Sequence, residues 1–159
     1  MKIDRMRAMH ASLAVAAALA AAVVLGTPGA AQAEPRARLE ITVIQAKAGP
    51  PFLHPELKPL WTTLRKTFGD KFAHYQKIAS REGVVDSGRA VSVPLPDGTV
   101  FEATFSGLTD VKNLLRVHLA FGEFRTKVRI HDGGVFFQAG RKYEGGTLII
   151  AVSAALADR

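Results

Sequence analysis

The segment from 114 to 131, LLRVHLAFGEFRTKVRIH, contains four basic side chains with the chemistry to bind an anion. They are Arg116, His118, Lys127 and Arg129. Apolar and polar residues alternate on both sides of Gly122-Glu123, which predicts two antiparallel strands joined by a two-residue turn. In that arrangement the apolar residues of both strands share one face, and the four basic residues share the other.

The predicted register places like charges directly opposite one another. On the polar face, the opposed pairs are Ala120 with Arg125, His118 with Lys127, Arg116 with Arg129, and Leu114 with His131. Like charges in this position disfavour a sheet by up to ~1 kcal/mol per pair. On the preceding strand the one acid available to offset them is Glu102, which we expect near Arg116 or His118.

Two interpretations of this basic face stay open. Long basic side chains can extend into water, where screening over ~10 Å weakens their repulsion. Alternatively, the face binds an anionic partner, and the candidates are an acidic polysaccharide, a lipid headgroup or an acidic protein surface. Nucleic acid is not expected, because the face lacks the interleaved aromatic rings on which bases stack.

Other residue types that carry chemistry do not form a known catalytic pattern. The histidines at 54, 74, 118 and 131 lack the short spacings of a zinc site, and no serine lies in a G-x-S-x-G sequence. Gly140 to Thr147 resembles a phosphate-binding loop, but Gly146 replaces its lysine and a β-type run follows. The sequence therefore predicts no cofactor and no metal. It does not argue for an enzyme, although an enzyme acting on an envelope polymer, assembled from distant residues, stays open as the alternative.

Residues 1–33 have the layout of a cleavable Sec-type signal peptide. Basic residues precede an apolar run over 11–25, which is shorter than the ~20 residues of a spanning helix. Ala31 and Ala33 fit the small residues that signal peptidase requires, so cleavage is expected before Glu34. The sequence thus predicts export to the periplasm or beyond, with no transmembrane segment in the mature form.

The remaining residues, 34–159, are predicted to form a single β-rich domain. Of the 21 basic and 14 acidic residues, three and one lie in the first 33, so this part carries a net charge of +5. The chain has no cysteine, which excludes disulfides and lipid attachment at cysteine.

The expected elements are one amphipathic helix and a series of strands. Apolar residues recur at intervals of three and four over 56–68, and we expect this helix to start near Pro59. Strands are expected over 38–46, 72–82, 89–95, 99–105, 114–121, 124–131, 134–140 and 146–154. The pattern over 72–82 is also compatible with a helix. A loop is expected over 47–55. Because 148–152 is apolar on both faces, we expect it to be the most buried strand. The fold class is α+β and β-dominated, with one helix packed on a mainly antiparallel sheet folded as a sandwich or partial barrel.

Three stretches carry a resemblance: HPELKPLWTTLRKTFGDKFAHYQKI, VSVPLPDGTVFEATFSGL and GRKYEGGTLIIAV. Together they resemble small exported bacterial proteins of unknown function, which share a leader, a short helix, an LP-D/N-G hairpin and a closing Gly-Gly strand. The resemblance spans about the last 100 residues. It implies export and a β-rich domain, and it implies no activity and no functional residues.

These observations lead to one functional expectation. We expect a non-enzymatic exported protein, a binding or envelope-associated accessory protein that acts through a surface or a sheet edge. A subunit of a secretion or surface assembly, joined through an unpaired edge strand, is a further alternative.

Overall fold

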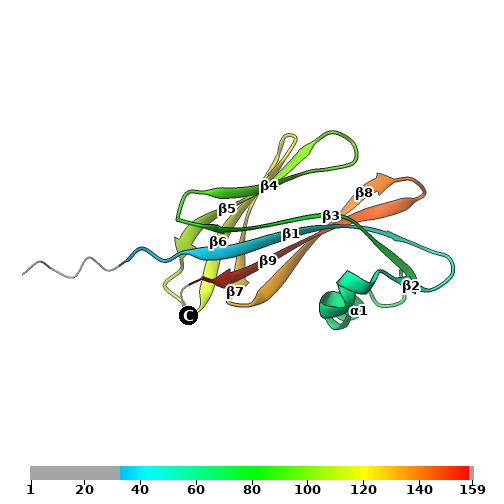
Figure 1. The fold of residues 1–159 in the computed structure, drawn as a ribbon, viewed down its shortest axis with the longest axis horizontal. Helices are drawn as coiled ribbons and strands as arrows, with labels where there is room; N and C mark the ends of the chain where they lie inside the picture. The colour runs from blue at the N-terminus through cyan, green and yellow to red at the C-terminus, as the bar shows by residue number, and fades with distance from the viewer. Residues whose placement is uncertain (1–32, 158–159) are drawn as a thin grey trace, which may run out of the picture. The chain divides into compact units, whose positions relative to one another are not determined.

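Residues 33–157, the part of the chain that the computed structural model describes, contain two mainly antiparallel sheets (Figure 1). The first sheet has the order β2-β3-β1-β9-β8, with β1 (Ala37–Lys47), β2 (Phe52–Leu53), β3 (His74–Val85), β8 (Gly134–Tyr143) and β9 (Gly146–Leu156). The second has the order β4-β5-β6-β7, with β4 (Ala90–Pro94), β5 (Val100–Leu108), β6 (Leu114–Phe121) and β7 (Phe124–His131). The predicted signal peptide lies outside the described residues, apart from Ala33.

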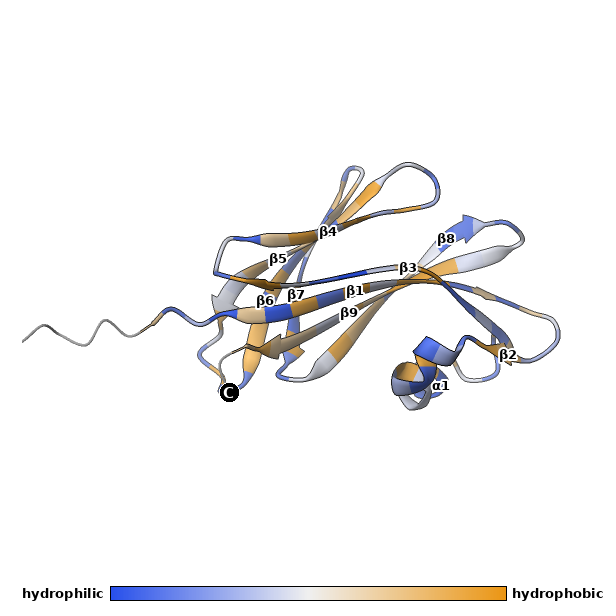
Figure 2. Ribbon diagram, in the orientation of Figure 1, coloured by the Kyte–Doolittle hydropathy of each residue, from blue (hydrophilic) through white to orange (hydrophobic). Residues whose placement is uncertain are grey.

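A hydrophobic core lies between the two sheets. Along β1, hydrophilic and hydrophobic residues alternate (Figure 2), and Leu39, Ile41 and Val43 point into this core. The second sheet contributes its inward apolar residues, which are Val91, Val93, Phe101, Ala103, Phe105, Leu115, Val117, Leu119 and Ile130. The β-dominated α+β class is therefore confirmed, and the architecture is a sandwich.

A 3₁₀ helix, η1 (Pro55–Leu60), leads into α1 (Trp61–Phe68). The α-helix thus begins at Trp61 and not near Pro59, since Pro59 lies within the 3₁₀ turn. A second core lies between these helices and the first sheet, with Leu57 and Leu64 fully buried against it. Its other buried members are Ile44, Ala46, Tyr75, Ile149 and Ala151. The helical stripe predicted from the sequence faces this core.

This second core makes parts of β1 and β9 buried on both faces. The run over 148–152 is buried throughout and lies between β1 and β8, as its apolar character indicated. It is not the most buried strand, however. β1 is buried at nearly every position from Leu39 to Ala46, since it lies at the centre of the sheet with strands on either side and a core on each face.

Three further elements differ in extent from the expectation. The loop expected over 47–55 includes β2, which pairs in parallel with β3. The ambiguous segment over 72–82 is a strand, β3, and it continues to Val85. β8 continues to Tyr143 through a bulge at Gly140, where φ is +127°. Across residues 33–157, no helix has the length and apolar character needed to cross a membrane.

Candidate anion-binding face

The hairpin of β6 and β7 has the register that the sequence predicted. The opposed pairs on its outer face are Leu114 with His131, Arg116 with Arg129, His118 with Lys127, and Ala120 with Arg125. The turn is Gly122-Glu123, and Gly122 has the positive φ of +55° that favours glycine. The four predicted site residues are therefore brought together on one face of the second sheet.

These side chains differ in their exposure and in what they contact. Arg116, Lys127 and Arg129 are exposed, whereas His118 is half-buried. Arg116 donates a hydrogen bond from Nη2 to the carbonyl oxygen of Leu108 at 2.6 Å, which fixes its guanidinium near the end of β5. No ion pair within residues 33–157 involves any of the four.

Arg125 also belongs to this face, although it is not among the four predicted site residues. It is exposed on β7, and its Nη1 donates to the carbonyl oxygens of Gly122 and Phe124, both at 2.8 Å. The predicted register had already placed it outward, opposite Ala120. We call Arg116, His118, Arg125, Lys127 and Arg129 the basic face.

Glu102 does not lie where it could neutralise Arg116. In the β5–β6 register Glu102 is opposite Ala120, and Thr104 is opposite His118. Of the two expected neighbours, Arg116 is wrong, because it lies four residues along β6 from Ala120. His118 is only two residues from Ala120, and it lines the same depression as Glu102. Glu102 accepts a hydrogen bond from the Thr104 hydroxyl at 3.5 Å and forms no ion pair within the described part of the chain.

A shallow depression of about 560 Å³ lies on this face. Its polar lining residues are Glu102, Thr104, His118, Arg125, Thr126 and Lys127. The depression holds one carboxylate, one imidazole and two cationic side chains, and it contains no serine and no second carboxylate. Such a set can donate hydrogen bonds to an anion, and it lacks the paired acids of a glycosidase.

The ion pairs of the described residues lie elsewhere in the fold. They are Arg36 with Asp86, Arg38 with Glu82, Lys77 with Glu56, and Arg141 with Asp97. The pair of Arg38 and Glu82 is the useful comparison, because it joins β1 to β3 across the outer face of the first sheet at 2.6 Å. On that face basic and acidic residues are interleaved. The outward residues of β6 and β7, by contrast, include no acid.

The other sequence motifs have structural roles. His54 accepts a hydrogen bond from the Glu56 N–H at the start of η1, and the His74 ring stacks on Phe52 with centroids 4.8 Å apart. Residues 33–157 contain no group of three or more His, Asp or Glu side chains that could hold a metal ion. Gly140 to Thr147 forms the β8–β9 hairpin, and its turn residues Glu144 and Gly145 both have positive φ.

Comparison of the chain with protein-family models, with curated proteins and with solved structures finds no match.

Proposed function

We propose that this protein is an exported, non-enzymatic binding protein whose basic face holds an acidic polysaccharide of the cell envelope. In this proposal the mature chain begins at Glu34 after removal of the signal peptide. The observation that carries it is the group of cations on adjacent strands with no carboxylate in ion-pair contact within the described residues.

Protection of the sheet edge is the simplest competing explanation for these charges. β7 is an edge strand, and charged residues on an edge prevent strand addition by a second chain. This accounts for Arg125, Lys127 and Arg129. It does not account for Arg116 and His118, because they lie on β6, which is paired on both sides.

The residues around the cations favour a polysaccharide over the other anionic partners. The phenyl rings of the β5–β7 strands, Phe101, Phe105, Phe121 and Phe124, occupy inward positions. The outer face therefore offers no ring other than the imidazoles of His118 and His131 for base stacking. Outward apolar side chains on β6 and β7 are limited to Leu114 and Ala120, which gives a lipid surface little to insert. Cations two residues apart on β7 repeat every ~7 Å, so the strand presents a row of positive charge along which an extended polyanion could lie.

Strand addition to a larger assembly receives less support. β7 carries three exposed cations on its outer face, and β8 carries a bulge at Gly140 followed by Arg141 and Lys142. β4 is short and ends in Pro94. All of these features oppose edge-to-edge pairing.

The test compares two variants that each remove two positive charges. Arg116→Thr with Arg129→Thr changes the basic face, and Arg36→Thr with Arg38→Thr changes two arginines that are paired with acids elsewhere. Binding to polygalacturonate, with neutral dextran as a control, is measured by titration calorimetry at low salt. We expect the first variant to bind about tenfold more weakly or worse, because a hydrogen bond to a charged group contributes about 1.5 kcal/mol or more. The second variant should stay within about twofold of the parent.

The outcome also depends on salt and on folding. Parent binding should weaken as salt rises through the range where charges are screened. The first variant removes the repulsion between Arg116 and Arg129, which stabilises the fold by about 1 kcal/mol. It also removes the Arg116 hydrogen bond to Leu108, which costs about the same. The free energy of unfolding of this variant should therefore change little. If both variants and the parent bind polygalacturonate with equal affinity at low salt, the basic face is only a solvated surface and the proposal fails.

A further inference from the structure

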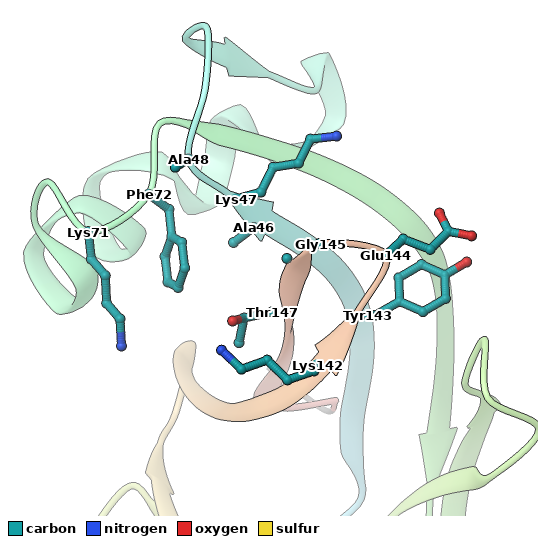
Figure 3. A pocket seen from close by; sticks show the side chains of 11 residues that line it. Ala46, Lys47, Ala48, Lys71, Phe72, Lys142, Tyr143, Glu144, Gly145 and Thr147 are labelled. Atoms are coloured by element: carbon teal, nitrogen blue, oxygen red, sulfur yellow. The ribbon is translucent and has the colours of Figure 1, made fainter.

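A second hollow lies at the far end of the first sheet, where β1 ends and the β8–β9 hairpin turns (Figure 3). Its volume is about 520 Å³, and it is open to solvent. The side chains that matter for its chemistry are Lys71, Phe72, Lys142 and Thr147. Lys142 and Thr147 belong to the Gly140 to Thr147 stretch that resembles a phosphate-binding loop in sequence, whereas Lys71 and Phe72 were not predicted to belong to a site. The hollow shares no lining residue with the basic face.

Two ammonium groups point into this hollow from different elements. Figure 3 shows Lys71 and Lys142 extending into the same space, with the Thr147 hydroxyl beside the end of Lys142. Lys47 also lines the hollow, but its side chain extends away from the other two. The converging donors are therefore two cations and one hydroxyl.

These lysines have no acidic partner among the described residues. Neither Lys71 nor Lys142 takes part in an ion pair there. The Lys71 Nζ lies 5.5 Å from the centre of the Phe72 ring, a cation–π contact that leaves its hydrogen-bond donors available. Glu144 is the one carboxylate in the lining, and Figure 3 shows it directed outward, away from Thr147.

The fold holds the walls of the hollow in place. Lys142 and Thr147 are a directly opposed pair in the β8–β9 ladder, and Thr147 is opposite Ala46 of β1. The Gln45 amide donates to the carbonyl oxygens of Tyr143 and Glu144, both at 3.4 Å, which ties the hairpin turn to β1. The donors thus lie on paired strands, while Lys71 and Phe72 follow the end of α1.

We infer that this hollow binds the phosphoryl group of a phosphate monoester. Two ammonium groups match the charge of about −1.5 to −2 that such a group carries at neutral pH, and two lysines with one hydroxyl supply donors for its three terminal oxygens. A carboxylate would leave one of the two positive charges unbalanced. The Phe72 ring and the open remainder of the hollow give the organic part of the ester an apolar wall. This inference stands apart from the proposed polysaccharide binding, because the two surfaces use different residues.

The test uses the full chain, labelled with ¹⁵N so that its backbone amides can be followed by NMR. The probes are sn-glycerol 3-phosphate and inorganic phosphate. Glycerol and acetate at matched ionic strength are the negative probes. We expect saturable shifts at Lys71, Phe72 and Thr147 with both phosphates, and tighter binding of the ester if the Phe72 wall contributes. Either phosphate probe giving saturable shifts there supports the site.

Two double variants with the same charge change identify the donors. Lys71→Gln with Lys142→Gln should weaken phosphate binding on the order of tenfold for each lysine. Lys47→Gln with Lys66→Gln is the control, because Lys47 extends away from the site and Lys66 is exposed on α1, and it should change the affinity by less than about twofold.

Three results would overturn the inference. The first is the absence of saturable shifts at these amides, the second is equal affinity in both double variants, and the third is an equal response to acetate. Shifts confined to β6 and β7 are a case of the first result, and they would leave the basic face as an anion site. Conversely, retention of the Lys71 and Thr147 shifts in the Arg116→Thr, Arg129→Thr variant would support the hollow whatever happens to polysaccharide binding.

Discussion

The Arg141 guanidinium on β8 lies 2.8 Å from the carboxylate of Asp97 in the β4–β5 turn, and this ion pair joins one sheet to the other. The same guanidinium lies 5.5 Å from the centre of the Phe121 ring at the end of β6. Asp97 in turn accepts a hydrogen bond from the Thr99 N–H at 2.9 Å. One turn is thereby fixed both internally and to the opposite sheet.

The pH dependence of stability should reveal this carboxylate. The hydrogen bond from the Thr99 N–H, with the Thr99 side chain and the Arg141 charge, lowers the pKa of Asp97 below its ordinary value. A lowered pKa in the folded state stabilises the fold above the unfolded value, about 3.9, and this contribution is lost as the pH falls through the folded pKa. We expect Asp97→Asn to be less stable than the parent at pH 7, with a difference that shrinks below about pH 4.

Urea unfolding at pH 7 and pH 3 measures that difference. Asp70→Asn is the matched control, because Asp70 is exposed and forms no ion pair among the described residues. A gap between parent and Asp97→Asn that stays constant from pH 7 to pH 3 would contradict a role for the ionised form.

Truncation of Trp61 should destabilise the domain by less than a fully buried tryptophan would. Trp61 is half-buried at the start of α1, with its ring edge-on to Tyr75 at 5.8 Å between centroids. Truncation of a fully buried tryptophan typically costs ~3–5 kcal/mol. With part of the ring in water, we expect about 2 kcal/mol for Trp61→Ala by denaturant unfolding.

Leu64→Ala sets the scale for that measurement, since Leu64 is fully buried in the same core. The Leu64→Ala variant should lose about 2–5 kcal/mol in free energy of unfolding. If Trp61→Ala leaves the unfolding midpoint unchanged while Leu64→Ala lowers it, the tryptophan makes no net contribution to the packing of α1.

Gly146→Ala should destabilise the β8–β9 hairpin through a backbone clash. A Cβ at this position would lie 2.7 Å from the carbonyl oxygen of Ala46, and a backbone atom in a central strand cannot move aside easily. We expect a loss of roughly 1–3 kcal/mol. Gly83→Ala is the comparison, because its Cβ would meet only the Val91 side chain, at 3.0 Å. A loss for Gly146→Ala no greater than that for Gly83→Ala would show that the strands can separate at this point.

A further prediction concerns residues 1–33 and the position of the mature N-terminus. If Ala31 and Ala33 direct cleavage, exported protein should begin at Glu34. Expression of the full chain in a bacterial host, followed by intact-mass measurement of the periplasmic fraction, tests this. An exported species that retains residues 11–25 would indicate a membrane anchor in place of a cleaved leader.

The sequence predicted the basic face because it depends on local features. Strict alternation over 114–131 and a two-residue turn at Gly122-Glu123 determine which side chains share a face and which lie opposite each other. The register of β5 against β6 was harder to predict. Several residues separate those strands, so no short turn fixes their alignment, and Glu102 came to lie opposite Ala120.

Features that depend on distant pairings could not be predicted from periodicity. Lys71 and Lys142 line one hollow because β1 pairs with β3 on one side and with β9, the partner of β8, on the other. Nothing in the sequence near either lysine indicates this pairing. The same holds for the central place of β1. Its alternation predicted one buried face, and the second face became buried because α1 packs there.

The position of β1 also has a consequence for how the chain reaches its native state. Its neighbours in the sheet are β3, which follows soon after it, and β9, which is the last of the described strands. A chain made from its N-terminus onward therefore holds β1 and β3 long before β9 exists. Until then one side of β1 has no hydrogen-bonding partner and its apolar residues are uncovered, which is the kind of intermediate that aggregates or binds chaperones. Folding of this sheet must follow synthesis of β9, and the long sequence separation between β1 and β9 makes it slow.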